Sequence, residues 1–298
     1  MNRYAAVDIG GTSIKYGVVD AAGRVLAAGQ VATEARLGPS ALAEKVKKTV
    51  GRELEEFPGI VGIGVSTAGV VEPHSGRIVF ANQNLPGYAG TDWKRILGSA
   101  FGLAVDVHND VNCAAMAEAW VGAAQGVPDF FCLTVGTGIG GALFLNGRLY
   151  EGAHGRAAEI GYMRTEGADG IYENVASMSA LVEQAEKRTG RREWDGKAVF
   201  RAAAEDPICG ALVEEWLEKL CRGVANAALL FDPPLIVIGG GVSNEGEAFT
   251  ERIRYCLARM FPDSLFWEGL AIRPAQCRNK AGIVGAAYGL AHAERAFG

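Results

Sequence analysis

The sequence predicts an α/β protein made of two similar domains. With 298 residues, the chain is too long for one small domain, and its length suits one large domain or two of ordinary size. Apolar runs typical of strands alternate with amphipathic stretches typical of helices. A strand that ends in glycines occurs in each half of the chain, at residues 8–13 and 135–141. This weak repeat predicts two α/β domains that face each other across a cleft, where small ligands commonly bind.

The first half reads as strands followed by alternating helices and strands. An amphipathic helix is predicted at 40–57, because Leu42, Val46, Val50 and Leu54 recur every four residues among charged positions. A second helix, at 91–101, has Thr91 or Asp92 as its cap. The predicted strands are 4–9, 13–19, 24–33, 60–66 and 103–107.

The second half begins the same pattern again. Asn146-Gly147 is a strong hairpin signal between two short strands, and Pro233 and Pro234 end a long helix. We expect an N-terminal domain over 1–109, a larger domain over 110–283, and a final helix at about 284–298 that packs back on the first. The predicted helices are 110–124, 211–231 and 281–297, and the predicted strands are 130–135, 141–145, 148–150 and 235–238.

Composition and charge exclude several classes of protein. A hydrophobic share of 49% excludes a disordered chain, and no apolar run reaches the ~20 residues of a membrane helix. Residues 1–13 lack the apolar core of a signal peptide, so we expect a cytoplasmic protein. A net charge of −5 argues against nucleic-acid binding. The six cysteines contain no C-x-x-C pair and are expected to be buried, reduced thiols.

Glycine is unusually frequent, at 41 residues, and three glycine clusters follow predicted strands. Without Cβ atoms, the backbone N–H groups of such turns can face a phosphate closely. In the first cluster Thr12 adds a hydroxyl, Lys15 is within reach, and Asp8 could hold a hydrated Mg²⁺. The third cluster is expected to open a later helix. The alternative is that these are tight turns only. The candidate cofactor-binding residues are Asp8, Gly10, Gly11, Thr12, Lys15, Gly136, Thr137, Gly138, Gly240 and Gly241.

Asp110 lies between a predicted strand and a predicted helix, and it has two interpretations. It could cap the helix, which is a common use of aspartate. It could instead be the general base that accepts a proton from a sugar hydroxyl during phosphoryl transfer, with Asn109 holding a neighbouring hydroxyl. Glu159 and Glu173 are further candidates to bind sugar hydroxyls, although a single Glu in a loop is normally just solvated.

Taken together, these motifs identify a resemblance over essentially the whole chain. The sequence resembles the ROK family of sugar kinases and repressors, in the actin-like ATPase superfamily. The resemblance implies two ribonuclease H-like domains that flank a cleft, and ATP-dependent phosphorylation of a hexose, usually at the 6-hydroxyl. The motifs that carry it are DIGGTSIK (8–15), NLPG (84–87), NDVN (109–112), TVGTGIGG (134–141), EIG (159–161) and GGGV (239–242).

The resemblance also implies roles for individual residues. Asp110 matches the catalytic base, and Gly240 with Gly241 match the adenosine side. The phosphate-binding positions are matched by Gly10, Gly11, Thr12, Gly136, Thr137 and Gly138. The sugar-binding positions are matched by Gly69, Asn84, Asn109, Glu159 and Glu173. ATP, Mg²⁺ and a sugar are the implied ligands, and a homodimer that closes around the sugar is the implied assembly.

The sequence departs from the family pattern in two places. Tyr162 stands where many members have a zinc-binding His, and 163–172 lack the accompanying cysteines, so we expect no structural zinc. The first strand begins near Tyr4, without the helix-turn-helix of the repressors. Members without zinc include β-glucoside kinases and N-acetylmannosamine kinases. We therefore expect a kinase for glucose or a β-glucoside such as cellobiose. The alternatives are an N-acetylmannosamine kinase and a non-catalytic sugar sensor.

Overall fold

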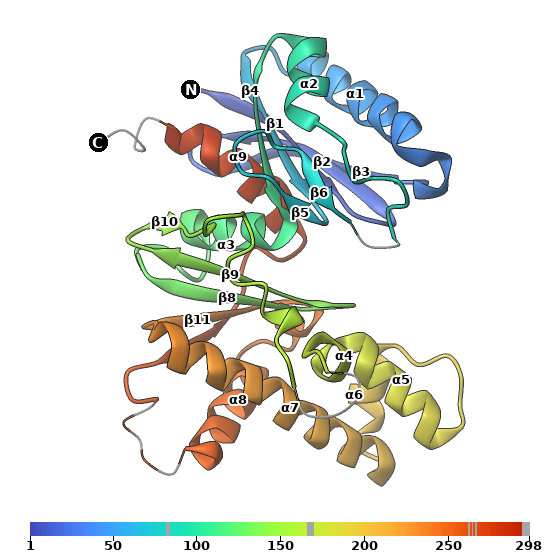
Figure 1. Cartoon of the computed structure of the whole chain (residues 1–298), viewed down its shortest axis with the longest axis vertical. Coiled ribbons are helices and arrows are strands. Elements are labelled where there is room, and N and C mark those ends of the chain that lie inside the picture. Colours follow the sequence, from blue (N-terminus) through green and yellow to red (C-terminus); the bar gives the residue numbers. More distant parts are fainter. Residues whose placement is uncertain (82–83, 166–169, 262, 264, 266, 294–298) are drawn as a thin grey trace. The chain divides into compact units, whose positions relative to one another are not determined.

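The structure is a computed structural model, and it describes residues 1–81, 84–165, 170–261, 263, 265 and 267–293. The chain forms two compact units (Figure 1). Unit 1 contains Met1–Gly126, Leu149–Ala157 and Cys277–Gly298, and unit 2 contains Val127–Arg148 and Ala158–Gln276. Within the described ranges, none of the helices is both long and apolar enough to cross a membrane.

Unit 1 is built on a five-stranded sheet with the order β3-β2-β1-β4-β7. The first three strands form an antiparallel meander, and β4 and β7 continue the sheet parallel to β1. The strands are β1 (Arg3–Ile9), β2 (Ser13–Asp20), β3 (Val25–Ala32), β4 (Ile60–Thr67) and β7 (Ala104–Asn109), and a small hairpin is formed by β5 (Val70–Val71) and β6 (Ile78–Phe80).

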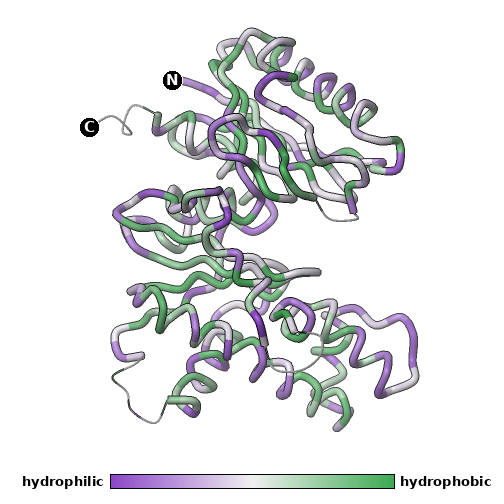
Figure 2. Tube along the Cα trace, viewed as in Figure 1, coloured by the Kyte–Doolittle hydropathy of each residue, from purple (hydrophilic) through white to green (hydrophobic). Residues whose placement is uncertain are grey.

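Helices cover both faces of this sheet (Figure 1). On one face lie α1 (Gly38–Glu56) and α2 (Trp93–Phe101), and on the other lie α3 (Asp110–Val121) and α9 (Ala281–His292). Glycines allow α9 to approach closely, since a Cβ at Gly285 would overlap the Cys113 carbonyl of α3. The apolar runs of the central strands are buried between these layers, which Figure 2 shows as hydrophobic segments. This packing makes the last described helix part of the first unit.

Unit 2 repeats the same strand order on a second sheet, β10-β9-β8-β11-β12. Strands β8 and β9 pair antiparallel, and β11 and β12 follow parallel to β8. Asn146 and Gly147 both have positive φ, at 54° and 73°, as the predicted two-residue hairpin requires. The strands are β8 (Phe130–Val135), β9 (Ile139–Leu145), β10 (Arg148–Leu149), β11 (Leu235–Gly240) and β12 (Ala271–Pro274).

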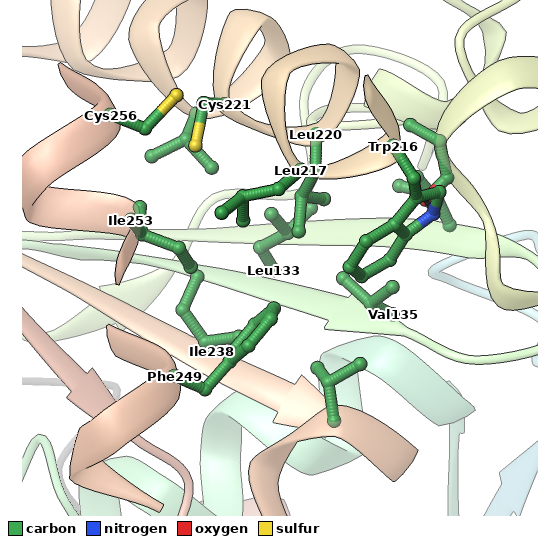
Figure 3. Packing of buried hydrophobic residues seen from close by; sticks show 14 of the residues in the cluster. Leu133, Val135, Trp216, Leu217, Leu220, Cys221, Ile238, Phe249, Ile253 and Cys256 are labelled. Atoms are coloured by element: carbon green, nitrogen blue, oxygen red, sulfur yellow. Dashed lines mark hydrogen bonds between the residues drawn. The ribbon is translucent and has the colours of Figure 1, made fainter. Parts of the chain in front are cut away.

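The core of unit 2 lies between its sheet and a group of helices. Trp216, Leu217 and Leu220 of the long α7 pack with Leu133 and Val135 of β8 and with residues of α8 (Figure 3). The Trp216 indole N–H donates to the carbonyls of residues 176 and 177, which anchors the shorter helices to α7. The helices are α4 (Glu173–Ala176), α5 (Met178–Thr189), α6 (Gly196–Ala202), α7 (Pro207–Phe231) and α8 (Glu247–Met260).

The predicted α/β class and the repeated unit are confirmed, since both sheets have the same strand order. Several details differ from the expectation. The division falls after Gly126 rather than after residue 109, because α3 packs on α9 within unit 1. The glycines at 239–241 lead into a 3₁₀ turn (Gly241–Glu245) before α8, instead of opening an α-helix directly. Strands β5 and β6 and helices α4–α6 have no counterpart among the elements predicted from the sequence.

Candidate functional site

In unit 1 the parallel strands bring several predicted residues to one edge of the sheet. Asp8 of β1 is aligned with Ser66 of β4, and Thr67 is aligned with Asn109 of β7. The chain therefore leaves this edge at the glycine turn after Asp8, at residues 68–69 and at Asp110. Open α/β sheets bind their ligands at the carboxyl ends of such strands.

Asp8 is mostly buried at this edge, with two polar neighbours. The Ser66 hydroxyl donates to Asp8 Oδ1 at 2.7 Å, and Lys15 Nζ lies 3.9 Å from Oδ2, directly across the β1–β2 ladder. A Cβ at Gly282 of α9 would overlap the Asp8 carboxyl, so only glycine fits there. Burial raises the pKa of Asp8, and the Ser66 hydrogen bond and the Lys15 charge act against that rise.

The glycine turn after Asp8 is held in place by its own strand neighbours. Gly10 N–H donates to the Ser13 carbonyl at 3.0 Å, and the Thr33 hydroxyl donates to the Gly10 carbonyl at 2.6 Å. A Cβ at Gly11 would lie 2.9 Å from the Asn84 Cβ, so the absent side chain leaves room for Asn84. The first predicted phosphate turn and a predicted sugar-binding residue thus lie in contact.

Asn109, not Asp110, caps helix α3. Its Oδ1 accepts from Val111 N–H at 2.8 Å and from Asn112 N–H at 3.3 Å, and its Nδ2 donates to the Gly69 carbonyl at 2.9 Å. The capping interpretation of Asp110 is therefore wrong. Asp110 is the first helical residue and is exposed, with Oδ1 accepting from Val111 N–H at 3.0 Å. Two predicted sugar-binding residues, Asn109 and Gly69, are thereby brought together beside Asp110.

A buried polar network that was not predicted from the sequence supports this edge. The Tyr88 hydroxyl lies 2.6 Å from the Thr67 hydroxyl and accepts from the Trp93 indole N–H at 2.6 Å. Burial raises the pKa of Tyr88 to about 12, so the phenol stays neutral. The network ties β4 to the loop that carries Asn84 and to α2. No sequence motif signals it, because its members are scattered over 67–93.

His108 is a second feature that the motifs did not single out. Its Nε2 lies 3.0 Å from Asp106 Oδ2, and its Nδ1 lies 3.7 Å from Glu151 Oε1. Burial opposes the charged imidazolium, but the adjacent Asp106 and Glu151 carboxylates outweigh burial and raise the pKa of His108. The pair with Glu151 fastens the segment Leu149–Ala157 to the strand that ends in Asn109.

In unit 2 two predicted carboxylates and a tyrosine form a cluster. Burial and the neighbouring Glu173 raise the pKa of Glu159. Tyr162 has a pKa that is raised by burial and by both carboxylates, while the residue remains 56% exposed. Glu173 Oε2 accepts from Ile139 N–H at 2.8 Å, and a Cβ at Gly138 would overlap this oxygen. Glu173 thus anchors the second glycine turn.

The second glycine turn borders a cavity that lies wholly within unit 2. The turn is closed by a hydrogen bond from Gly136 N–H to the Gly138 carbonyl at 2.9 Å, and Met178 N–H donates to the Gly136 carbonyl at 2.9 Å. The cavity has a volume of about 620 Å³, and Gly136, Thr137 and Gly241 line it. Gly138 and Gly240 do not line it. Gly240 packs on β8, where its φ of 82° and the Val135 carbonyl leave no room for a side chain.

The cavity wall suits a partly apolar ligand. Trp194, Phe200, Met178, Val182 and Val242 supply apolar surface, and Glu183, Glu186 and Lys197 are among its charged groups. A few polar groups on a mainly apolar wall are typical of small-molecule sites. Trp194 and Phe200 belong to the segment around α6, for which the sequence predicted no element.

The described residues offer few side chains that could bind a metal ion together. Among the described residues, no group of three or more His, Cys, Asp and Glu side chains is arranged to hold a metal ion. Asp8 offers a single carboxylate, which suits a largely hydrated Mg²⁺ and no tightly caged ion. The expected absence of structural zinc stays a prediction.

The paired sheets and the turns at their edges define a class of protein, the actin-like ATPase fold. Within that class the chain belongs to the ROK family, whose family model matches residues 4–294. A β-glucoside kinase of Listeria innocua is 37% identical over 295 residues, covering 96% of both chains.

Two solved structures have the same fold over nearly the whole chain. A ROK family glucokinase from Streptomyces griseus, solved with glucose and AMPPNP, is 32% identical with a TM-score of 0.83, covering 96% of this chain and 98% of the other. A structure described as a candidate N-acetylmannosamine kinase, from Listeria monocytogenes, is 32% identical with a TM-score of 0.86, covering 98% and 99%.

Proposed function

We propose that this ATP-dependent sugar kinase phosphorylates the 6-hydroxyl of glucose or of a β-glucoside such as cellobiose, with Asp110 as general base. The proposal rests on the different roles of two adjacent residues, Asn109 and Asp110, at the start of α3. Asn109 caps the helix and holds the Gly69 carbonyl, so the adjacent Asp110 is exposed at the edge of the sheet.

In the proposed reaction Asp110 accepts the proton of the sugar hydroxyl as its oxygen bonds to the γ-phosphorus of ATP. The bond from the γ-phosphorus to the bridging oxygen breaks, and ADP leaves with that electron pair. A positioned carboxylate matters because a free sugar hydroxyl is a very weak acid. Phosphoryl transfer otherwise depends mainly on positioning and on stabilising charge.

The remaining polar candidates would bind the sugar. In unit 1, Asn84, Asn109 and the turn at Gly69 offer amide and backbone groups at the edge of the sheet that carries Asp110. In unit 2, Glu159 and Glu173 each offer carboxylate oxygens that can accept from hydroxyls. The neutral phenol of Tyr162 can donate to a sugar oxygen, which makes it a candidate determinant of selectivity.

ATP would use the two glycine turns and the cavity of unit 2. Gly136, Thr137 and Gly241 border that cavity, whose aromatic and apolar wall suits an adenine ring. Gly10, Gly11 and Thr12 offer a second turn for phosphate oxygens, and Lys15 adds a cation beside it. Gly138 and Gly240 would act by shaping the turns, since neither lines the cavity. Asp8 would hold a hydrated Mg²⁺, which supplies neutralising charge to the phosphates when bound.

Two alternatives come from particular observations. The likeness to the Listeria monocytogenes structure favours N-acetylmannosamine as a second candidate sugar. A sugar sensor without activity would keep the fold but would not need Asp110 and both glycine turns. The similarity to the Listeria innocua enzyme favours a β-glucoside over N-acetylmannosamine.

The test is release of ADP from Mg-ATP with a panel of sugars, run with wild type and Asp110→Asn. The panel contains glucose, cellobiose, gentiobiose, N-acetylmannosamine, N-acetylglucosamine, mannose, fructose and allose. Turnover on glucose or cellobiose that is lost in the variant is expected. Tight sugar binding without turnover would replace the kinase by the sensor. Polyphosphate in place of ATP tests the phosphoryl donor.

The assembly and cellular location are part of the same proposal. We expect a cytoplasmic homodimer that binds a sugar and does not bind nucleic acid or membranes. Light scattering of the purified protein tests the dimer, because a monomeric mass at micromolar concentration would contradict it.

A further inference from the structure

A small pocket in unit 2 lies apart from the 620 Å³ cavity, with none of its lining residues in common. Its volume is about 90 Å³, and it lies between α7 and the chain around residues 163–165 and 172–175. The Tyr172 ring forms part of its wall, packing on Gly223 of α7 and donating from its hydroxyl to the Leu220 carbonyl at 2.6 Å. The pocket therefore has a fixed wall.

The charge of this pocket is one-sided. Arg164, Lys219 and Arg222 line it, and among the described residues of its lining none is an aspartate or a glutamate. Lys219, Arg222 and Asn226 are three and four residues apart on α7, so they share one face of the helix. A protein with a net charge of −5 thus gathers three cations around one small space.

Three arginines near this pocket, in contrast, each lie beside a carboxylate of α7. Glu215 of α7 pairs with Arg188 at 2.6 Å, Glu214 pairs with Arg252 at 2.8 Å, and Glu218 lies 3.9 Å from Arg259. Across the part of the chain that the structure describes, no such ion pair includes a cation of the small pocket. The charge of Lys219 does act on Glu215, where it helps to lower the pKa of that carboxyl, but it makes no close ion pair there. Like charges held close together repel, and an anion between them would reduce that repulsion.

A buried hydroxyl gives a second, independent indication of a ligand. Thr165 lines the same pocket, and its Oγ1 is buried with no hydrogen-bond partner among the described residues. Buried polar groups nearly always have a partner, and an exception calls for an explanation such as an ion. The hydroxyl can donate to an anionic oxygen.

We propose that this pocket binds a phosphate group, either as inorganic phosphate or as a phosphomonoester. Its volume suits one tetrahedral oxyanion, and arginine donates paired N–H groups that match phosphate oxygens. Asn226 and Thr165 add neutral donors on two sides. The site is separate from the turns assigned to ATP.

The position of the pocket links it to the sugar side of unit 2. Met163 and Tyr172, which line it, directly adjoin Tyr162 and Glu173 in the chain. Phosphate bound here is therefore expected to change KM for the sugar, a consequence that rests on the proposed function. The binding itself does not rest on it.

Calorimetry with inorganic phosphate tests the binding, using the full chain saturated with Mg-AMPPNP so that the nucleotide site is filled. One phosphate per chain is expected. Arg222→Gln and Lys219→Gln should each weaken it about tenfold or more, in line with the loss of a charge-assisted contact. Thr165→Val, which keeps the shape and removes the hydroxyl, should weaken it by a smaller factor. Arg259→Gln is the matched control and should leave it unchanged.

Two results would overturn the proposal. One is the absence of a phosphate site in the AMPPNP-saturated protein. The other is equal affinity in wild type, Arg222→Gln and Lys219→Gln, which would assign the heat to another place. Glucose 6-phosphate in place of phosphate distinguishes the two sources: tighter binding assigns the site to a phosphomonoester, and equal or weaker binding assigns it to free phosphate. A loss of kinase activity without loss of this binding would affect the proposed function only.

Discussion

The two units share one strand order and differ in what surrounds it. In unit 1 the turn after the first strand is preceded by Asp8 and tied by Thr33, and the edge of the sheet carries Asn109 and Asp110. In unit 2 the corresponding turn is tied by Glu173 and borders a cavity built by additional helices. The same strand order therefore places equivalent turns in both units. We expect the different segments around each turn to determine which part of a ligand it binds.

The largest expected effect tests the assignment of the proton acceptor to unit 1. Asp110→Asn should lower kcat by about 10²-fold or more, because the amide cannot accept the proton. Sugar affinity by calorimetry should stay nearly unchanged. Asp232→Asn is the control, since Asp232 is exposed in a left-handed conformation that asparagine tolerates. A near-normal rate in Asp110→Asn would remove Asp110 from this role.

The next prediction concerns the stability of unit 1, through a buried glutamate in helix α1. Glu53 of α1 is 5% exposed, and neither carboxyl oxygen has a hydrogen-bond partner among the described residues. Burial, aided by the charge of Glu56, raises the pKa of Glu53 to about 9. Between pH 4.5 and 9 the folded state keeps a proton that the unfolded state releases, so the free energy of unfolding falls as pH rises.

Glu53→Gln removes this titration. At pH 7 the variant should be more stable by about 3 kcal/mol, and its stability should change less between pH 5 and 9. Urea unfolding at several pH values measures both. Glu55→Gln, an exposed position on the same helix, should keep the wild-type slope. Parallel pH profiles for wild type and Glu53→Gln would contradict the assignment.

A smaller effect tests the cavity of unit 2. Gly241 lines the cavity, and a Cβ there meets nothing within 4 Å, so Gly241→Val should fold normally. Its side chain would occupy ligand space, at a cost of about 1–3 kcal/mol, or about ten- to a hundred-fold in KM for ATP. Gly98→Ala, at a helical glycine of unit 1 where a Cβ would make only ordinary contacts of 3.8 Å or more, is the control. An unchanged KM for ATP would remove the nucleotide from this cavity.

The smallest effect concerns the tyrosine in the carboxylate cluster. Tyr162→Phe removes a neutral hydroxyl donor, worth about 0.5–1.5 kcal/mol, so KM for the sugar should rise about two- to tenfold. KM for ATP should not change, and comparison of the two constants is the measurement. An equal rise in both would point to a disturbed loop instead of a lost sugar contact.

Much of the fold could be predicted because periodicity and glycine positions are local signals. The four-residue spacing from Leu42 to Leu54 and the Asn146-Gly147 turn each specify an element within a few residues. The short helices α4–α6 could not be predicted, since they depend on packing against Trp216 and its neighbours in α7.

The candidate site was less predictable, because motifs name residues but not their hydrogen bonds. Asn109 and Asp110 are adjacent and equally able to cap, and only the helix start decides between them. Ser66, His108 and Tyr88 hold the site through long-range contacts that leave no motif. The roles of the predicted site residues stay predictions that the variants above can test.

The placement of α9 has a consequence for biosynthesis. This helix packs on β1, β4 and α3, so the first unit to leave the ribosome lacks part of its core until the end of the chain is made. Unit 2 ends at Gln276 and has no such dependence. The second unit can therefore finish folding first, and premature termination before residue 281 would leave one face of the N-terminal sheet covered by α3 without α9.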